Sequence, residues 1–560
     1  MAHVITQACC NDASCVAVCP VGCIRPGPDE PGFATTEMLY IDPATCIDCG
    51  VCVPTCPVGA ISRDDALTGI DTAYLDINAA YYQHNPIRQT LGPVDLPAPA
   101  LTPAPGPLRV AIVGSGPAGS YAARELLEHR GVEVAIFDRL PTPGGLIRAG
   151  VAPDHPATKS IAGVFDPMMS DYRVRLYLDV EVGTHLTHSE LLAHHHAVIY
   201  AHGAAGDRRL DIPGEELRGS VSATEFVNWY NGHPDYADRA FDLSGTRAVI
   251  IGNGNVALDV ARVLVTDPDR LARTDMADHA VNALRHSAIE EVVVVGRRGP
   301  AQAAYTTPEL LALSNLPGVD VITYLSETEL DSASHSMVHD PASPSSLRHK
   351  TRIASEYSTR PTTSGNRRIV LRYLATPAEI LGSDHVTGLR LTRNRLGPDP
   401  SGTLRVVPTG IEETIDAGLI LRAIGYRGAP LPGLPFDTSR AVLPNDAGRV
   451  HDPATDSVLT GVYTTGWIKR GPSGVIGTNK ACAKETVGQL LADFAAGHLT
   501  APTTSTLEFE ALIRERRPNL VDLTGWQAID SEERHIGRLH DKPRSKLTDI
   551  TELRAAALPR

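Results

Sequence analysis

Nine of the ten cysteines in this 560-residue chain fall within residues 9–56. The densest group has the pattern Cys46-x2-Cys49-x2-Cys52-x3-Cys56-Pro57. This spacing places three thiolates on a tight loop that holds three irons of one four-iron cluster, and the cysteine before proline binds the other cluster of a pair. The pattern therefore predicts two iron–sulfur clusters near the N-terminus.

An altered copy of the motif lies upstream, in the order Cys9-x2-Asp12-x2-Cys15-x3-Cys19-Pro20. A carboxylate oxygen in the second position binds iron less firmly than a thiolate, so a 3Fe–4S cluster is favoured there. A 4Fe–4S cluster with Asp12 or water on one iron is the alternative. The crossover rule assigns Cys9, Cys15 and Cys56 to the upstream cluster, and Cys19, Cys46, Cys49 and Cys52 to a downstream 4Fe–4S cluster.

A glycine turn, Gly114-Ser115-Gly116-Pro117-Ala118-Gly119, follows the apolar run 110–113 and precedes a helix-like segment at 120–129. Gly114 allows the turn, Gly116 lets the backbone approach a pyrophosphate, and Gly119 lets helix and strand pack closely. A second strand ends at Asp138, 24 positions beyond Gly114 and near the expected place of a ribose-binding acid. These features predict a dinucleotide site.

A second turn, Gly252-Asn253-Gly254-Asn255-Val256-Ala257, follows the strand-like run 248–251 and opens a helix. Two such turns imply two dinucleotides and electron or hydride transfer between them. The next strand, 291–295, ends in Gly296-Arg297-Arg298 instead of an acid. Two arginines suit a 2′-phosphate, which favours NADP over NAD, although a pair of surface arginines is the alternative.

The cysteine motifs and the two glycine turns predict an α+β ferredoxin-like domain followed by an α/β portion with two Rossmann-like domains. We expect the ferredoxin-like domain at 1–91, a proline-rich linker at 92–107, a first nucleotide-binding domain at 108–208 and 375–498, and an inserted NADP domain at 209–374. A C-terminal extension, 499–560, has no predicted role. The linker holds six prolines and is expected to be a semi-rigid tether.

The formal net charge of −14 argues against nucleic acid or anionic lipid as a partner. Residues 1–91 alone contain ten carboxylates and three arginines, so an acidic carrier that meets a basic partner is expected. We see no signal peptide and no apolar run long enough to span a bilayer, so no membrane association is expected. The expected compartment is the cytoplasm.

Residues 108–498 resemble adrenodoxin reductase and its bacterial ferredoxin–NADP reductase relatives. The matching stretches are GSGPAG, PTPGGL, GVAPDHP, IPGEE, GNGNVALDVAR, VGRRGP, AIGYRG and GWIKRGPSGVIGTN. Residues 1–91 resemble seven-iron bacterial ferredoxins. The whole chain resembles the fused ferredoxin/ferredoxin–NADP reductases of actinobacteria.

The resemblance implies contacts for residues at matching positions. FAD would contact Ser115, Asp138, Leu146, Val180, Trp467, Gly474, Val475 and Ile476. NADP would contact Arg208, Asn253, Gly254, Asn255, Val256, Arg297, Arg298, Glu309 and Gly474. His155 and Asp259 match a proton-transfer pair, and a histidine suits that role near neutral pH.

The expected activity is that of a ferredoxin–NADP reductase. NADPH would give a hydride to FAD, which would pass single electrons to the clusters and to an external ferredoxin or other one-electron acceptor. The alternative is an electron-distributing subunit of a larger complex. A thiol-disulfide reductase is disfavoured because no Cys-x-x-Cys pair lies in the reductase portion.

Overall fold

The computed structural model describes residues 1–87, 107–399 and 403–558. The predicted linker 92–107, apart from its last residue, lies outside the described residues. Within the described part of the chain, no helix combines the length and apolar character needed to cross a membrane.

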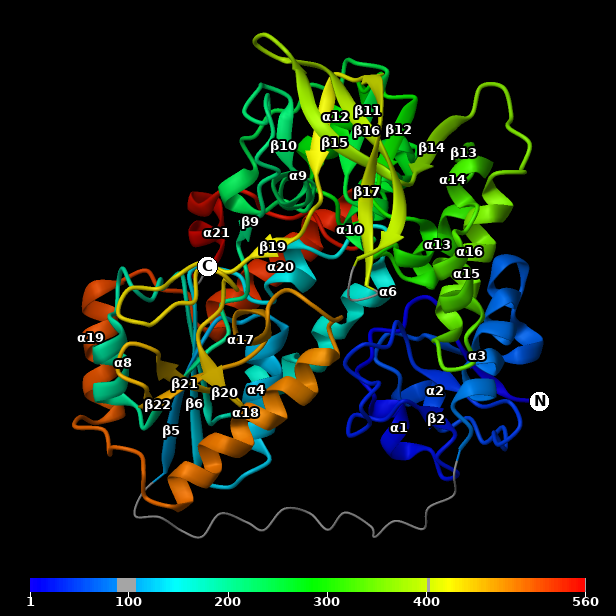
Figure 1. The fold of residues 1–560 in the computed structure, drawn as a ribbon. Helices are drawn as coiled ribbons and strands as arrows, with labels where there is room; N and C mark the ends of the chain where they lie inside the picture. Colours follow the sequence, from blue (N-terminus) through cyan, green and yellow to red (C-terminus); the bar gives the residue numbers. More distant parts are fainter. Residues whose placement is uncertain (88–106, 400–402, 559–560) are drawn as a thin grey trace.

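Residues 1–87 form the N-terminal unit, drawn in blue in Figure 1. Two short antiparallel pairs, β1 (His3–Ile5) with β4 (Ile61–Arg63) and β2 (Ile24–Arg25) with β3 (Tyr40–Ile41), surround helices α1 (Ser14–Val18) and α2 (Cys52–Thr55). Helix α3 (Ala73–His84) holds the pairs together, because Asn78 accepts from the Ile41 backbone N–H and donates to the Ile5 carbonyl, both at 2.9 Å. This is the expected α+β arrangement.

The first nucleotide unit is built on a seven-stranded sheet in the order β20-β21-β22-β8-β5-β6-β7. The strands are β5 (Leu108–Val113), β6 (Val132–Asp138), β7 (Val174–Leu178), β8 (Ala197–Tyr200), β20 (Asn445–Asp446), β21 (Arg449–Asp452) and β22 (Ser457–Thr464). The five strands from β22 to β7 are parallel. Helices α4 (Pro117–Leu127) and α18 (Thr478–Ala495) pack together beside this sheet.

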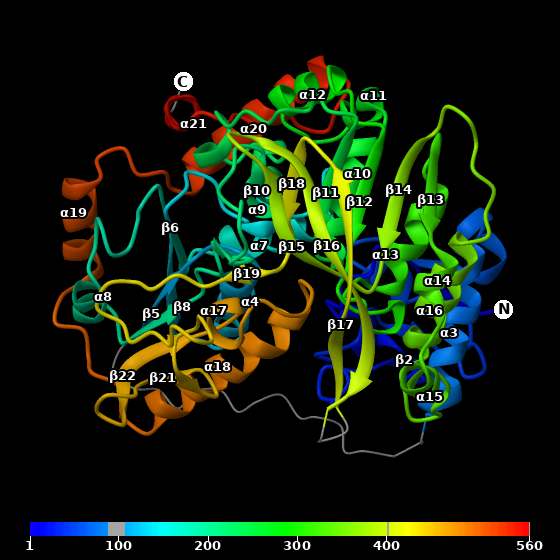
Figure 2. The same ribbon diagram turned by 45° about the horizontal axis from the view of Figure 1, so that its top comes forward.

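The second nucleotide unit contains a parallel six-stranded sheet in the order β10-β18-β11-β12-β14-β13. Its strands are β10 (Ser220–Ser222), β11 (Arg247–Ile251), β12 (Glu291–Val295), β13 (Val319–Thr323), β14 (Arg367–Arg372) and β18 (Leu419–Arg422). Helices α10 (Asn255–Val265), α13 (Thr307–Ala312) and α16 (Ser345–Tyr357) flank it, as Figure 2 shows.

The chain returns to the first sheet later than the boundary expected after residue 374. Strand β18 pairs with β11 in the second sheet, and the antiparallel strands β15 (Ala375–Gly382), β16 (Val386–Pro398) and β17 (Leu404–Asp416) precede it. Apolar residues of β15 and β16 share a buried cluster with β11 and β12. Residues 375–422 therefore pack with the second unit, because their apolar faces are buried there.

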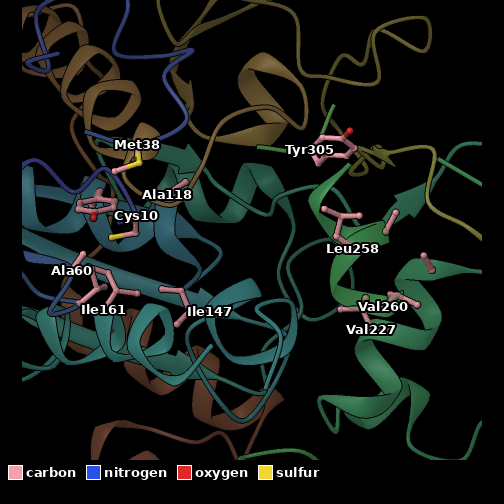
Figure 3. Close-up of a cluster of buried hydrophobic side chains, with 14 of the residues drawn as sticks. Cys10, Met38, Ala60, Ala118, Ile147, Ile161, Val227, Leu258, Val260 and Tyr305 are labelled. Atoms are coloured by element: carbon pink, nitrogen blue, oxygen red, sulfur yellow. The ribbon is translucent and has the colours of Figure 1, made fainter. Parts of the chain in front are cut away.

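The N-terminal unit shares one buried apolar cluster with both nucleotide units. Figure 3 shows Cys10 and Met38 of the N-terminal unit beside Ala118 and Ile161 of the first nucleotide unit. Helix α3 also lies against α16 of the second unit, as the blue and green ribbons of Figure 1 show. The N-terminal unit is thus packed on the two nucleotide units as well as joined to them by the chain.

The C-terminal extension runs across both nucleotide units. Helix α19 (Thr506–Arg516) adds Phe509 to the core of the first sheet, and α20 (Leu523–Leu539) and α21 (Ile550–Ala556) follow. Lys546 forms an ion pair with Asp275 at 2.9 Å, and Glu533 forms one with Arg148 at 2.5 Å. The extension fastens loops of the two units to each other.

Candidate nucleotide and iron–sulfur sites

The first glycine turn leaves the carboxyl end of β5 and enters α4. Gly114 has a φ of +108°, and a side chain on it would overlap the Ala201 carbonyl. A side chain on Gly119 would overlap the carbonyl of Gly114. Gly116 caps α4, whose first N–H groups are free to face an anion. This backbone is a cradle that fits a pyrophosphate.

Asp138 ends the neighbouring strand β6 and faces the turn. Its carboxylate accepts from the Ser115 backbone N–H and the Leu140 backbone N–H, both at 3.0 Å. The Val180 N–H donates to the Asp138 carbonyl at 2.8 Å, and Val180 is buried. Leu146 opens helix α5 (Leu146–Ala149) after Gly145, whose backbone touches that of Gly116. The structure therefore gathers these expected FAD contacts around one cradle.

A second strand-to-helix connection, residues 466–477, closes the same region. Trp467 opens helix α17 (Trp467–Arg470), and its ring lies 5.1 Å from that of Tyr426. Gly474 has a φ of +78°, and the Val475 N–H donates to the Thr478 hydroxyl at 3.1 Å. Residues 474–476 thus form a tight turn directly before α18, with Ile476 partly buried.

The second glycine turn repeats the geometry of the first. Gly252 has a φ of +115° and no room for a side chain against the Ala423 carbonyl, and Gly254 caps α10. The Asn253 carbonyl accepts from the Tyr305 backbone N–H at 2.9 Å, and the Asn255 side-chain oxygen accepts from the Thr306 backbone N–H at 2.8 Å. Val256 packs in the first turn of α10. The arrangement fits a second pyrophosphate.

Arg297 and Arg298 follow β12, at the same sheet edge as this turn. Both side chains are exposed, and in the described part of the chain neither guanidinium has a hydrogen bond or ion pair. Arg208 lies beside β9 (Gly206–Asp207), where its N–H donates to the Gly425 carbonyl at 3.2 Å. Three cations near one cradle give the edge a positive charge suited to a phosphate.

His155 and Asp259 lie together between the units, in a cluster that also contains Glu309. The His155 Nε2 is 3.8 Å from Asp259 Oδ1 and 3.7 Å from Glu309 Oε2. The buried Arg262 guanidinium donates to Asp259 at 2.8 Å and to Asp154 at 2.5 Å. His155, Asp259 and Glu309 could hold a cation by distance alone, but Arg262 already supplies a positive charge there.

Burial and charge tune these groups in opposite directions. Burial raises the pKa of the Glu309 carboxyl, and the charge of Asp259 adds to this effect while His155 opposes it. Burial alone would raise the pKa of Asp154, but the Arg262 guanidinium outweighs it and holds that pKa below its usual value. Glu309 is therefore the carboxyl best suited to bind a proton, next to an imidazole.

All ten cysteines are free of disulfides, and the seven expected to bind clusters form two groups. Cys19, Cys46, Cys49 and Cys52 line one small cavity together with Cys23. Burial raises the pKa of the Cys52 thiol to about 11, and the nearby Cys46, Cys19 and Cys49 add to the effect. This group matches the donor set expected for the downstream cluster.

The upstream group contains Cys9, Cys15 and Cys56. Burial raises the pKa of the Cys9 thiol to about 11, and the charge of Cys56 adds to this effect. Burial and the charges of Cys9 and Cys56 also raise the pKa of the Cys15 thiol. Backbone N–H groups point at the sulfurs, from Leu39 to Cys9 at 3.5 Å and from Ala60 to Cys56 at 3.3 Å. Three gathered thiols with backbone donors fit a cluster with three cysteine ligands.

The side chain of Asp12 is occupied elsewhere. Its carboxylate accepts from the Tyr121 hydroxyl at 2.7 Å and from the Ser14 N–H at 3.3 Å, and its carbonyl accepts from Lys480 at 3.1 Å. Burial alone would raise the pKa of Asp12, but Lys480 and the hydrogen bonds lower it. These contacts tie the upstream loop to the first nucleotide unit and favour a cluster without Asp12 as ligand.

Sequence patterns did not indicate the residues that join the units. Arg262 and Asp154 lack a motif of their own, and Tyr121 reads as an ordinary helix residue. The Glu37 carboxylate accepts from the Thr307 N–H at 2.8 Å and pairs with Lys350 at 3.2 Å. Gln7 donates to Glu309 at 3.4 Å. Only the acid-rich N-terminal composition could have pointed to such ionic contacts.

Comparisons with known proteins agree with this geometry. Residues 108–300 match the pyridine nucleotide-disulphide oxidoreductase family, and residues 39–62 match the 4Fe-4S binding domain. The solved structure of Mycobacterium tuberculosis FprA in complex with NADPH has a TM-score of 0.76 and 44% identity, and the match covers 81% of this chain and all of that one.

Two curated relatives match the whole chain. The probable ferredoxin/ferredoxin–NADP reductase of Mycobacterium tuberculosis is 50% identical to this chain, and the match covers 95% of that protein. The protein of the same name from Mycobacterium leprae is 49% identical, with 98% of its length covered. The NADPH-ferredoxin reductase FprA of M. tuberculosis is 46% identical over 80% of this chain and 98% of its own length.

Fold and site together define a flavoprotein oxidoreductase with two nucleotide-binding units and a 4Fe–4S domain. Within that class, the chain belongs to the family of fused ferredoxin/ferredoxin–NADP reductases. The expectations for family and fold class are confirmed.

Proposed function

We propose that this chain is a ferredoxin–NADP⁺ reductase that carries electrons between NADPH and one-electron acceptors through FAD and two iron–sulfur clusters. The observation that carries the proposal is the meeting of three sites. His155 of the first nucleotide unit lies 3.8 Å from Asp259 of α10, the helix that begins at the second cradle. The turn before α18 touches the upstream cysteine loop through a 2.8 Å hydrogen bond from the Gly477 N–H to the Cys10 carbonyl.

FAD, when bound, would accept a hydride from NADPH and release electrons one at a time, which is why a flavin must stand between a two-electron donor and clusters. The proposed FAD residues are Gly114, Ser115, Gly116, Gly119, Asp138, Leu146, Val180, Trp467, Gly474, Val475 and Ile476. The proposed NADP residues are Arg208, Asn253, Gly254, Asn255, Val256, Arg297, Arg298, Glu309 and Gly474.

The remaining residues handle protons and clusters. We assign proton transfer to His155 and Asp259, positioned by Arg262, because these groups are partly buried and meet between the two nucleotide units. Cys19, Cys46, Cys49 and Cys52 would bind a 4Fe–4S cluster. Cys9, Cys15 and Cys56 would bind the second cluster, for which the contacts of Asp12 favour the 3Fe–4S form.

Anaerobic titration of the purified chain tests this proposal. NADPH should bleach the flavin absorbance and then the broad cluster absorbance, and iron, sulfide and flavin analyses should give seven irons per FAD. A chain that contains no flavin, or whose flavin NADPH does not bleach, would refute it. The alternative of a subunit in a larger complex is not favoured, because the relatives that match the whole chain are named as reductases.

A further inference from the structure

The two cysteine groups differ in what covers them. The upstream loop lies against the first nucleotide unit, through Tyr121, Gly477 and Lys480. The downstream loop comprises residues 46–53. Among the described residues, its hydrogen bonds and ion pairs stay within the N-terminal unit, for example between Asp48 and His3 at 3.0 Å. One cluster site is therefore covered by the reductase and the other faces solvent.

The solvent-facing loop carries apolar side chains that nothing covers. Ile47 is 60% exposed, Val51 45% and Val53 37%, and Cys49 between them is also exposed. Three of the thirteen large apolar side chains left exposed in the described residues thus fall within a segment of seven residues. A concentration of exposed apolar side chains around metal ligands marks a contact surface.

Acidic residues border this surface. Asp48 belongs to the loop and pairs with His3 at 3.0 Å, and His3 lies opposite Arg63 in the β1–β4 pair. Arg63 in turn pairs with Asp65 at 2.8 Å, next to Asp64. Arg63 is the single cation of this group, and residues 1–91 contain no lysine. The surface thus has an apolar centre and an acidic border. It is complementary to a partner protein whose contact surface has an apolar centre and a basic border.

We infer that Ile47, Val51 and Val53, bordered by Asp48, Asp64 and Asp65, form an exit surface at which a basic one-electron acceptor protein docks. The inference rests on the proposed function and adds the place where electrons leave. One NADPH is oxidised to NADP⁺ and a proton that enters solvent, and its two electrons reduce two acceptor molecules by one electron each. The acceptor docks on the N-terminal unit, because that unit covers the reductase face beside α18.

Binding of oxidised cytochrome c, a basic one-electron haem protein, to the holoenzyme tests the surface without NADPH. Ile47→Lys and Val51→Lys should each raise the Kd at least tenfold at low ionic strength, because a cation is placed against a basic partner. Ile411→Lys is the matched control, since Ile411 is 63% exposed on β17, and its Kd should equal that of the wild type. Equal Kd values for all four proteins would overturn the inference.

Two further readouts separate the possible causes of failure. Carbodiimide coupling of cytochrome c lysines to the unmodified holoenzyme should map to Asp48, Asp64 and Asp65, and links confined to carboxylates outside the N-terminal unit would refute the surface. A dimer that the Ile47→Lys change dissolves would show a second copy as the occupant and would also refute it. Iron content identifies any variant that has lost a cluster.

NADPH-dependent reduction of ferricyanide distinguishes this inference from the proposed function. If the wild type does not reduce the dye, the proposed function fails. If dye reduction persists while Ile47→Lys and Val51→Lys bind cytochrome c as tightly as the wild type, only the exit surface fails.

Discussion

The hydroxyl of Tyr121 donates a 2.7 Å hydrogen bond to the carboxylate of Asp12. Tyr121 belongs to α4, the helix that begins at the first nucleotide cradle, and Asp12 belongs to the upstream cysteine loop. One bond thus connects a helix that a flavin would touch with a loop that a cluster would occupy. Electron carriers held by such contacts keep a fixed separation.

Loss of this bond should loosen the N-terminal unit. Tyr121→Phe leaves a buried carboxylate with one fewer donor, which costs about 1–3 kcal/mol. We expect the cluster absorbance to disappear at a lower temperature during heating, whereas Tyr172→Phe, on a side chain 86% exposed, should leave the transition unchanged. Identical transitions for both variants would show that the bond adds no stability.

The two parts of the chain should stay together after the linker is cut. A protease site placed at 92–106 removes the covalent connection, but the shared apolar cluster and the contacts of Glu37 and Asp12 remain. Both fragments should elute as one species in gel filtration at micromolar concentration. Separate elution would mean that the covalent linker is needed to keep the N-terminal unit in place.

Asp12→Cys should raise the iron content from seven to eight per FAD, because a thiolate can hold the fourth iron of the upstream cluster. Asp12→Asn is the control. Since the native carboxylate is bonded to Tyr121, its replacement by an amide should leave the iron content at seven. EPR spectra and iron analysis measure the outcome for both variants. Loss of iron in the Asp12→Asn variant would identify Asp12 as a ligand.

The double variant Arg297→Ala with Arg298→Ala should discriminate between the nicotinamide nucleotides. Each charge-assisted hydrogen bond to a 2′-phosphate contributes about 1.5–3 kcal/mol, so the KM for NADPH should rise at least tenfold. The KM for NADH should change little, because NADH has no such phosphate. Arg395→Ala, in the exposed hairpin of β16, is the control; parallel losses for both nucleotides would contradict the assignment.

Glu533→Gln should destabilise the protein in a pH-dependent way. Burial alone would raise the pKa of Glu533, but Arg148 and Arg544 outweigh it and hold that pKa below its usual value. The stabilisation is therefore present above the unfolded pKa of about 4.3 and is lost as pH falls through the folded value. At pH 7 the midpoint of thermal unfolding should fall by an amount that corresponds to a loss of about 3 kcal/mol in the free energy of unfolding. The difference between variant and wild type should shrink below about pH 4.3.

The ion pair between exposed Arg534 and partly buried Asp530 offers the comparison for this change. Arg534→Gln removes a surface ion pair and should shift the midpoint far less at any pH. A pH-independent effect of Glu533→Gln would show that packing, and not charge, makes Glu533 important.

Local patterns predicted most of the fold and the nucleotide cradles. Strand β12 begins and ends at the expected residues 291–295, because an apolar run that ends at a glycine leaves little choice. The cysteine groups follow from spacing alone. The return to the first sheet was misplaced because β15 to β18 have the same alternating pattern whichever sheet they join, and only their packing on β11 and β12 decides.

Contacts between units could not be predicted. Glu37, Tyr121 and Lys480 lie hundreds of positions from their partners or in unrelated segments, and no local periodicity records which helix end meets which loop. From the sequence, Glu533 is likewise one of several charges on an amphipathic helix. Only the structure shows its ion pairs with Arg148 and Arg544. Such pairs are properties of the assembled surfaces, so a single sequence does not contain their signal.

Gly477 has no side chain at the point where α18 meets the Asn11 carbonyl, and even a methyl group there would overlap that carbonyl. In the proposed electron path, the distance between the flavin and the upstream cluster would thus depend on the absence of a side chain at this one position. A larger residue would push the cysteine loop away from α18 and slow electron transfer, even with both halves of the molecule intact.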